Sequence, residues 1–276
     1  MTLVGAATAT CSAPPPFRFQ PGIDQAFQRL YSSDYRGAQS ALDQYLAQQP
    51  GDPVGYAVKA SAYLFTELDR MGILESEFFE SDKKVGDSHK RPGADPAART
   101  AFYQNIDKAQ TLARAALSAN PNDENALFAA CLALGNQTDF MALIERRQLA
   151  SLSLTRQSYR EAKHLLNLNP RFYDAYLSTG FTEYVFSSLP SLVRFFVRFD
   201  DVKGDKQQAL RHLEIVASQG HYLKPFAKIL LATAALRDHR LRDAQGILLE
   251  LTQSYPANNL LQRELAKVNQ RVRQGG

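Results

Sequence analysis

Few residues in this 276-residue chain are of types and at spacings that support catalysis or metal binding. None of its five histidines has a second histidine or a cysteine three or four residues away, the spacing that a metal site on one helix needs. These histidines are His89, His164, His212, His221 and His239. The sequence also contains no glycine-rich phosphate loop, nucleophile elbow or pair of metal-ligand cysteines. It therefore predicts no catalytic residues, no cofactor and no metal, and hence a protein that is not an enzyme.

Composition narrows the class of protein further. The chain is 45% apolar, and we expect no apolar run to approach the length of a membrane span. Its net charge of +4 comes from basic residues interleaved with 28 acids, so no basic stripe for nucleic acid is expected. Two cysteines cannot define a disulfide framework, and Cys131 is expected to be a buried free thiol.

One pattern of residue spacing recurs four times, and it predicts the helices that would position a binding site. A small residue is followed by an apolar or bulky residue seven places on, a proline twelve places on, and a second small residue ten places after the proline. The four copies are Ala38, Tyr45, Pro50 and Ala60; Ala109, Ala116, Pro121 and Cys131; Ser158, Leu165, Pro170 and Gly180; and Ala244, Leu251, Pro256 and Ala266. Seven residues are two helical turns, and the proline ends the helix. The pattern predicts helical hairpins that bury their apolar faces by stacking.

This pattern resembles the tetratricopeptide repeat (TPR). The family has a large residue four places before the small one of the first helix, and Tyr56, Leu127 and Tyr176 match it. The resemblance implies an all-α, right-handed α-solenoid of about five TPR-like hairpins with long insertions and a C-terminal capping helix. The expected organisation is an N-terminal segment (1–16) and a single repeat domain (17–276), with repeats over 19–52, 53–123, 124–172, 173–221 and 222–257 and a cap over 258–273. In that cap Ala266 is expected to face the stack.

Three insertions interrupt the repeats. The second hairpin has some 37 extra residues between Ala60 and Ala109, including Phe78 and Phe79. These two rings either tuck under a neighbouring hairpin, which is the favoured interpretation, or occlude the groove of the solenoid. The second insertion, between Cys131 and Ser158, predicts one long helix over 141–168. The third lies between Gly180 and Ala209.

The third insertion carries an aromatic stripe. Leu192, Phe195, Phe196 and Phe199 share one helical face, beside a pair of arginines. Core packing is the favoured interpretation, and peripheral membrane contact is the alternative. Residues 180–260 also resemble the tetratricopeptide family thirty-nine proteins and the related fungal inclusion-body-clearance proteins. That resemblance implies a helical-repeat protein without catalysis.

The first sixteen residues are uncharged and end in three prolines. The run from Leu3 to Ala9 resembles the end of a secretory signal peptide, although the basic start is missing. The alternative is a tail ahead of a proline spacer, and lipid attachment at Cys11 is the weakest option. The sequence therefore leaves both an exported, periplasmic location and a cytoplasmic one open.

The repeat register places a candidate binding groove on the first helices of the hairpins. Its positions are Asn125, Phe128, Leu132, Asp174, Leu177, Phe181, Tyr184, Phe226, Ile229 and Thr233. The lining is apolar and aromatic, which favours a protein or peptide partner. We therefore expect a non-catalytic adaptor. The alternative is an exported carrier of a lipid or another apolar small molecule, and the insertions could also fill the groove.

Overall fold

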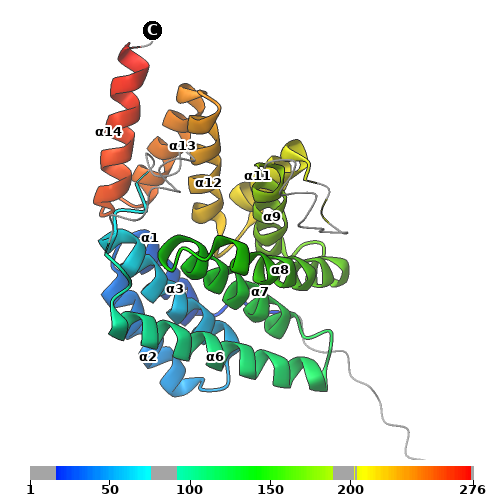
Figure 1. Cartoon of the computed structure of the whole chain (residues 1–276). Helices are drawn as coiled ribbons and strands as arrows, with labels where there is room; N and C mark the ends of the chain where they lie inside the picture. The colour runs from blue at the N-terminus through cyan, green and yellow to red at the C-terminus, as the bar shows by residue number, and fades with distance from the viewer. Residues whose placement is uncertain (1–16, 76–91, 189–201, 203, 275–276) are drawn as a thin grey trace, which may run out of the picture.

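The computed structural model describes residues 17–75, 92–188, 202 and 204–274, and every regular element in these ranges is a helix (Figure 1). The predictions made for residues 1–16, for Phe78 and Phe79, and for the stripe of Leu192, Phe195, Phe196 and Phe199 lie outside the described residues.

The helices pair as five hairpins and a final helix, which confirms the expected all-α solenoid. The first three hairpins are α1 (Pro21–Tyr31) with α2 (Tyr35–Gln48), α3 (Pro53–Arg70) with α6 (Pro96–Ala119), and α7 (Glu124–Asp139) with α8 (Gln148–Leu168). The next two are α9 (Tyr176–Ser188) with α11 (Lys206–Gln219), and α12 (Lys224–Arg237) with α13 (Leu241–Ser254). The last helix, α14 (Asn259–Gln274), packs on α13.

Aspartate caps determine where many of these helices begin. The side chain of each capping residue accepts a hydrogen bond from a backbone N–H two or three residues further on, which satisfies one of the free donors of the first turn. The caps are Asp34, Asp52, Asp95, Asp123 and Asp205. Asp52 and Asp95 are followed directly by a proline, which fits the first helical position because its missing N–H would have no partner there.

The prediction of one long helix over 141–168 is wrong. α7 instead runs on into a π-helical turn, η2 (Phe140–Ile144), and the chain bends before α8 begins at Gln148. Arg146 has a φ of 61°, a left-handed conformation that a right-handed helix cannot continue through. The residues of the second insertion therefore lengthen both helices of the third hairpin, and the bend between them lies at Glu145–Arg147.

Small residues lie at the helix crossings. Ala38, Ala60, Ala109 and Ala244 have no exposed surface. Gly180 lies at the crossing of α9 and α11, where a Cβ atom would be 3.0 Å from the carbonyl oxygen of Ala209. The exception is Ala266, which was expected to face the stack and is exposed. α14 turns another face inward, with Leu261, Glu264 and Val268 buried.

The stack curls until its ends meet, so the start of α14 lies beside α1 (Figure 1). The side-chain amide of Asn258 donates to the carbonyl oxygen of Tyr31 at 2.8 Å, across 227 positions of sequence. The Tyr31 hydroxyl donates to the carbonyl oxygen of Tyr222 at 2.9 Å, and the Tyr222 hydroxyl accepts from the backbone N–H of Gln20 at 2.8 Å. These bonds join the first hairpin and the residue before it to the turns that precede α12 and α14.

One helical run, Glu124–Ile144, is long and apolar enough to cross a membrane, contrary to the expectation that no such run exists. Its mean hydropathy is 1.4, but 61% of it is buried inside the protein. It packs against α3, α6 and α8. A core helix meets the same criteria of length and composition, so this run is weak evidence for a membrane span.

Candidate functional site

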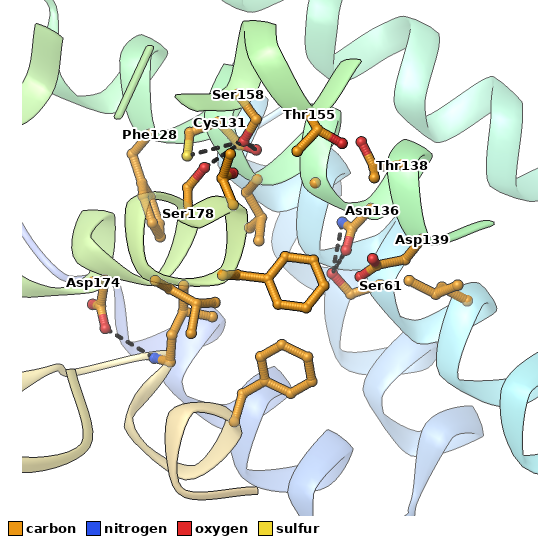
Figure 2. Close-up of a pocket in the computed structure, with 18 of the residues that line it drawn as sticks. Ser61, Phe128, Cys131, Asn136, Thr138, Asp139, Thr155, Ser158, Asp174 and Ser178 are labelled. Carbon is orange, nitrogen blue, oxygen red and sulfur yellow. Dashed lines mark hydrogen bonds between the residues drawn. The ribbon is translucent and has the colours of Figure 1, made fainter. Parts of the chain in front are cut away.

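A cavity of about 100 Å³ lies on the inner face and is partly open to the surface. Its walls come from α1, α3, α7, α8, α9 and the start of α12 (Figure 2). The larger apolar side chains of the walls are Leu64, Phe65, Leu132, Leu177, Phe181 and Phe226. All of these except Leu64 are only partly buried, so they present apolar surface to whatever enters.

The structure places six of the ten predicted groove residues around this cavity: Phe128, Leu132, Asp174, Leu177, Phe181 and Phe226. The other four lie elsewhere. The Asn125 side chain donates to the carboxylate of Asp52 at 3.1 Å. Ile229 packs into the core of the C-terminal hairpin, and the Thr233 hydroxyl donates to its carbonyl oxygen at 2.9 Å. Tyr184 is half-buried further along α9. The role of the six in binding remains a prediction.

Phe128 belongs to the core as much as to the cavity, since only 1% of its surface is exposed. Its ring lies 5.0 Å from that of Phe172 and 5.9 Å from that of Phe17, which enters from the N-terminal side of α1. It is also stacked at 6.2 Å on Tyr222. The described N-terminal residues and the first hairpin therefore fill part of the predicted groove.

Asp174, in the short 3-10 helix η3 (Tyr173–Ala175), has a structural role at one edge of the cavity. Its carboxylate accepts three backbone hydrogen bonds of 3.0–3.1 Å, from His221, Tyr222 and Leu223. Burial raises the pKa of Asp174, and the three N–H donors oppose that rise. The carboxylate therefore fixes the turn between α11 and α12 and is not free to bind a partner.

Two hydrogen-bond networks use other polar groups of the lining (Figure 2). Ser158 donates to the carbonyl oxygen of Cys131 at 3.0 Å and shares a 2.8 Å hydrogen bond with Ser178. Burial raises the pKa of the Cys131 thiol, which is free as expected. No histidine, lysine or arginine lines the cavity among the described residues, and the thiol is hydrogen-bonded to the Ser158 hydroxyl at 3.5 Å.

The second network joins α7 to α3. The Asn136 amide donates to the Ser61 hydroxyl at 2.8 Å and to the carbonyl oxygen of Ala57 at 2.9 Å. Ser61 is buried, so the network also replaces the water that both side chains would otherwise bind. It fixes the α3 wall against the α7 wall and leaves neither side chain free.

Asp139 was missed at the sequence level, and it is a carboxylate of the lining whose pKa burial raises strongly. It is the last residue of α7, directly before the π-helical turn, and it lies on the same side of the cavity as Asn136 and Ser61 (Figure 2). Its carboxylate makes no hydrogen bond or ion pair with any described residue, and burial alone raises its pKa to about 7. The neighbouring Thr138 hydroxyl is also buried without a partner among the described residues. Perturbed, unpartnered groups of this kind mark candidate binding sites.

A sequence signal for Asp139 did exist. Groove positions follow one helical face, and the prediction stopped at Phe128 and Leu132. Continuing the same face by steps of three and four reaches Gly135 and then Asp139, and both line the cavity.

A second cluster of titratable groups lies between α9 and α11. The Tyr159 hydroxyl donates to one Glu183 oxygen at 3.3 Å, and His212 Nδ1 lies 3.3 Å from the other. The Thr179 hydroxyl lies 3.1 Å from the same histidine nitrogen. Glu183 is thus paired with a histidine, and these residues do not line the cavity. Within the described ranges no group of three histidine, cysteine or acidic side chains is placed to hold a metal ion.

Comparison with known proteins shows similarity of fold only. No protein-family model matches the chain, and no curated protein matches it. Among solved structures, the chain is similar to a thermophilic TPR protein from Thermus thermophilus, with 16% sequence identity and a TM-score of 0.46. The match covers 89% of this chain and 98% of that one. The narrower resemblance to the fungal inclusion-body-clearance proteins is not confirmed.

Proposed function

We propose that this chain is a non-catalytic scaffold that binds a segment of a protein partner at the cavity on its inner face. The observation that carries the proposal is the set of partly buried apolar side chains from α3, α7, α9 and α12 that converge on this partly open cavity. Apolar walls with a few polar groups are typical of binding pockets. The lining contains no histidine or lysine among the described residues, and the Cys131 thiol is hydrogen-bonded to the Ser158 hydroxyl and not to a base, which supports binding over catalysis.

The size of the cavity favours a side chain as its occupant. At about 100 Å³ it is smaller than the roughly 150 Å³ cavity that accepts benzene in another protein. An acyl chain would require considerably more room. We therefore favour the protein-binding scaffold over the lipid carrier.

The test is a double substitution on one face of α9, Leu177→Ser with Phe181→Ser. Both side chains are partly buried cavity walls, so their loss removes apolar contact with a partner. We expect at least a tenfold loss of the partners captured from native cells, measured by quantitative mass spectrometry against wild-type capture. Polar replacement of Phe128 would be a poor test, because its ring lies in the core and the variant could unfold.

The matched control is Leu149→Ser with Leu249→Ser. These leucines are 76% and 48% exposed and lie on α8 and α13. Capture should be unchanged, and circular dichroism should show that both double variants stay helical. Undiminished capture by a folded Leu177→Ser, Phe181→Ser protein would rule out the inner face as the binding surface.

A further inference from the structure

The unpartnered carboxylate of Asp139 is a feature that the proposed scaffold does not explain. The polar groups nearest to it in Figure 2, Asn136 and Ser61, satisfy each other. Asp139 has no such partner among the described residues, although it lines the cavity. Polar groups inside proteins are normally hydrogen-bonded, so a carboxylate without a protein partner at a cavity indicates a missing ligand.

The charge of the lining indicates what kind of ligand is missing. The charged side chains that line the cavity are two carboxylates, Asp139 and Asp174, and the lining contains no lysine, arginine or histidine among the described residues. Asp174 is already satisfied by three backbone N–H groups. Asp139 is thus the acid without a cation, and a positively charged group would complement it.

The walls and the volume restrict that cation. At about 100 Å³ the cavity is smaller than the roughly 150 Å³ cavity that accepts benzene, so it suits a narrow unbranched chain better than a ring system. The larger apolar side chains of its walls are leucines and phenylalanines. A lysine side chain meets both conditions, because its methylenes can lie along apolar surface while its ammonium group reaches a polar site.

We infer that the cavity accepts a lysine side chain of the bound partner, with the ammonium group at Asp139 and the methylenes between Leu132, Leu177 and Phe181. This inference rests on the proposed function, since the lysine belongs to the segment bound at the inner face. It assigns Asp139 as the residue that determines which partner segments are bound.

The ammonium site is tested with n-butylammonium chloride and its uncharged counterpart butan-1-ol, by NMR titration of the full chain at pH 8. We expect the wild-type protein to bind the ammonium at least tenfold more tightly than the alcohol. Asp139→Asn should lose at least tenfold in ammonium affinity and keep its alcohol affinity. Asp107→Asn, which removes an exposed acid of α6, should behave as wild type and so controls for net charge.

The affinity for the ammonium should also fall as the pH is lowered through about 7. A protonated Asp139 must lose its proton to pair with the cation, and its pKa is raised to about 7. The other titratable side chains of the lining are Tyr31, Cys131 and Asp174, and those from α3, α8, α9 and α12 include none. Burial raises the pKa of Tyr31 and of Cys131 above their usual alkaline values, so both stay neutral over this range.

The source of the ammonium group is tested with twelve-residue peptide libraries that carry a central lysine or a central norleucine. Norleucine has the same methylenes without the charge. We expect at least tenfold enrichment of the lysine library on the wild-type protein and no preference on Asp139→Asn.

Four results would overturn the inference. Equal binding of ammonium and alcohol, or undiminished ammonium binding by Asp139→Asn, removes the ammonium site. Binding of n-butylammonium without enrichment of the lysine library would mean that the site binds a free amine and not the lysine side chain of a partner. The proposed function fails separately, when the Leu177→Ser, Phe181→Ser variant keeps its partners. If that variant loses its partners while Asp139→Asn keeps its lysine preference, the scaffold stands and the role of Asp139 does not.

Discussion

Two aspartates on the inner face show how local surroundings decide the role of a residue. Asp174 accepts three backbone hydrogen bonds and fixes a turn. Asp139 has no partner among the described residues, and its pKa is raised to about 7 by burial. Only Asp174 was predicted as a groove residue, because the repeat register reached it. The register identifies which positions face inward, and it does not identify which of their polar groups remain free.

At the residue scale we predict that Asp139 destabilises the unliganded protein in a pH-dependent way. Its carboxyl titrates near pH 4 in the unfolded chain and near pH 7 in the folded one. Between these values the unfolded state releases the proton first, so the free energy of unfolding falls as the pH rises and levels off above about 7. Asp139→Asn removes this cost. Since water reaches the cavity, we expect a gain of about 2 kcal/mol at pH 8, roughly half of the full shift.

The measurement is urea denaturation of wild type and Asp139→Asn at pH values from 4 to 8. The difference between the two should be near zero at pH 4 and largest at pH 8, while other titrating groups contribute equally to both proteins. A difference that is constant with pH, or that grows toward low pH, would show that the pKa of Asp139 is not raised in the folded state.

At the element scale, the prolines and aspartates predicted where helices stop and start better than they predicted helix length. The turns at Pro50, Pro121, Pro170 and Pro256 each separate two helices in the structure. The π-helical turn after α7 has no comparable sequence signal, and the next helix begins at Gln148 and not at the predicted residue 141. One or two residues, such as a proline or a capping aspartate, are enough to determine a turn. Where no such residue ends a helix, its end depends on the elements that it packs against.

At this scale we predict opposite effects for two glycine-to-alanine substitutions in helices. A Cβ atom at Gly180 would meet the backbone oxygen of Ala209 and the Cβ of His212 at 3.0 Å, so α9 and α11 must move apart. We expect a loss of about 1 kcal/mol. At Gly246 in α13 a Cβ would meet nothing within 4 Å, and the better helix propensity of alanine should raise stability by about 0.5–1 kcal/mol. Thermal denaturation of the two single variants measures both effects, and stabilisation by Gly180→Ala would mean that the crossing has room to spare.

At the scale of the whole molecule, closure of the curl distinguishes this chain from an open repeat array. In an open array each repeat contacts only its neighbours. Here the first hairpin contacts the turn between α11 and α12 and the start of α14, through Tyr31, Tyr222 and Asn258. The inner face is therefore shared by distant repeats, and the cavity depends on all of them being in place.

We predict that Asn258→Ala weakens both ends of the chain at once. The substitution removes the cap on the Leu261 N–H at 3.0 Å and the hydrogen bond to the Tyr31 carbonyl oxygen. We expect a loss of about 2 kcal/mol in unfolding free energy, together with faster amide hydrogen exchange in α1 as well as α14. Asn259→Ala, at the exposed neighbouring position, is the control and should change little. Faster exchange confined to α13 and α14 would show that the closure contact contributes no stability.

The sequence alone determined the class of fold and the register of its helices. Side-chain periodicity and proline placement act over one or two turns, so they can be read from neighbouring residues. They predicted the hairpins, the buried Cys131 and six of the residues around the cavity, including Leu177 and Phe181.

Tertiary structure decided how those hairpins close on one another and which polar groups are left without partners. The contact between Tyr31 and Asn258 closes the stack. Its formation depends on the small rotation of each hairpin relative to the one before it, summed over five hairpins, and no local sequence pattern predicts that sum. Whether Asp174 or Asp139 is free depends on backbone N–H groups supplied from about fifty residues away. The physical reason is the distance along the chain over which each effect acts. Helix formation depends on neighbouring residues, whereas desolvation and charge pairing depend on everything that packs around a group.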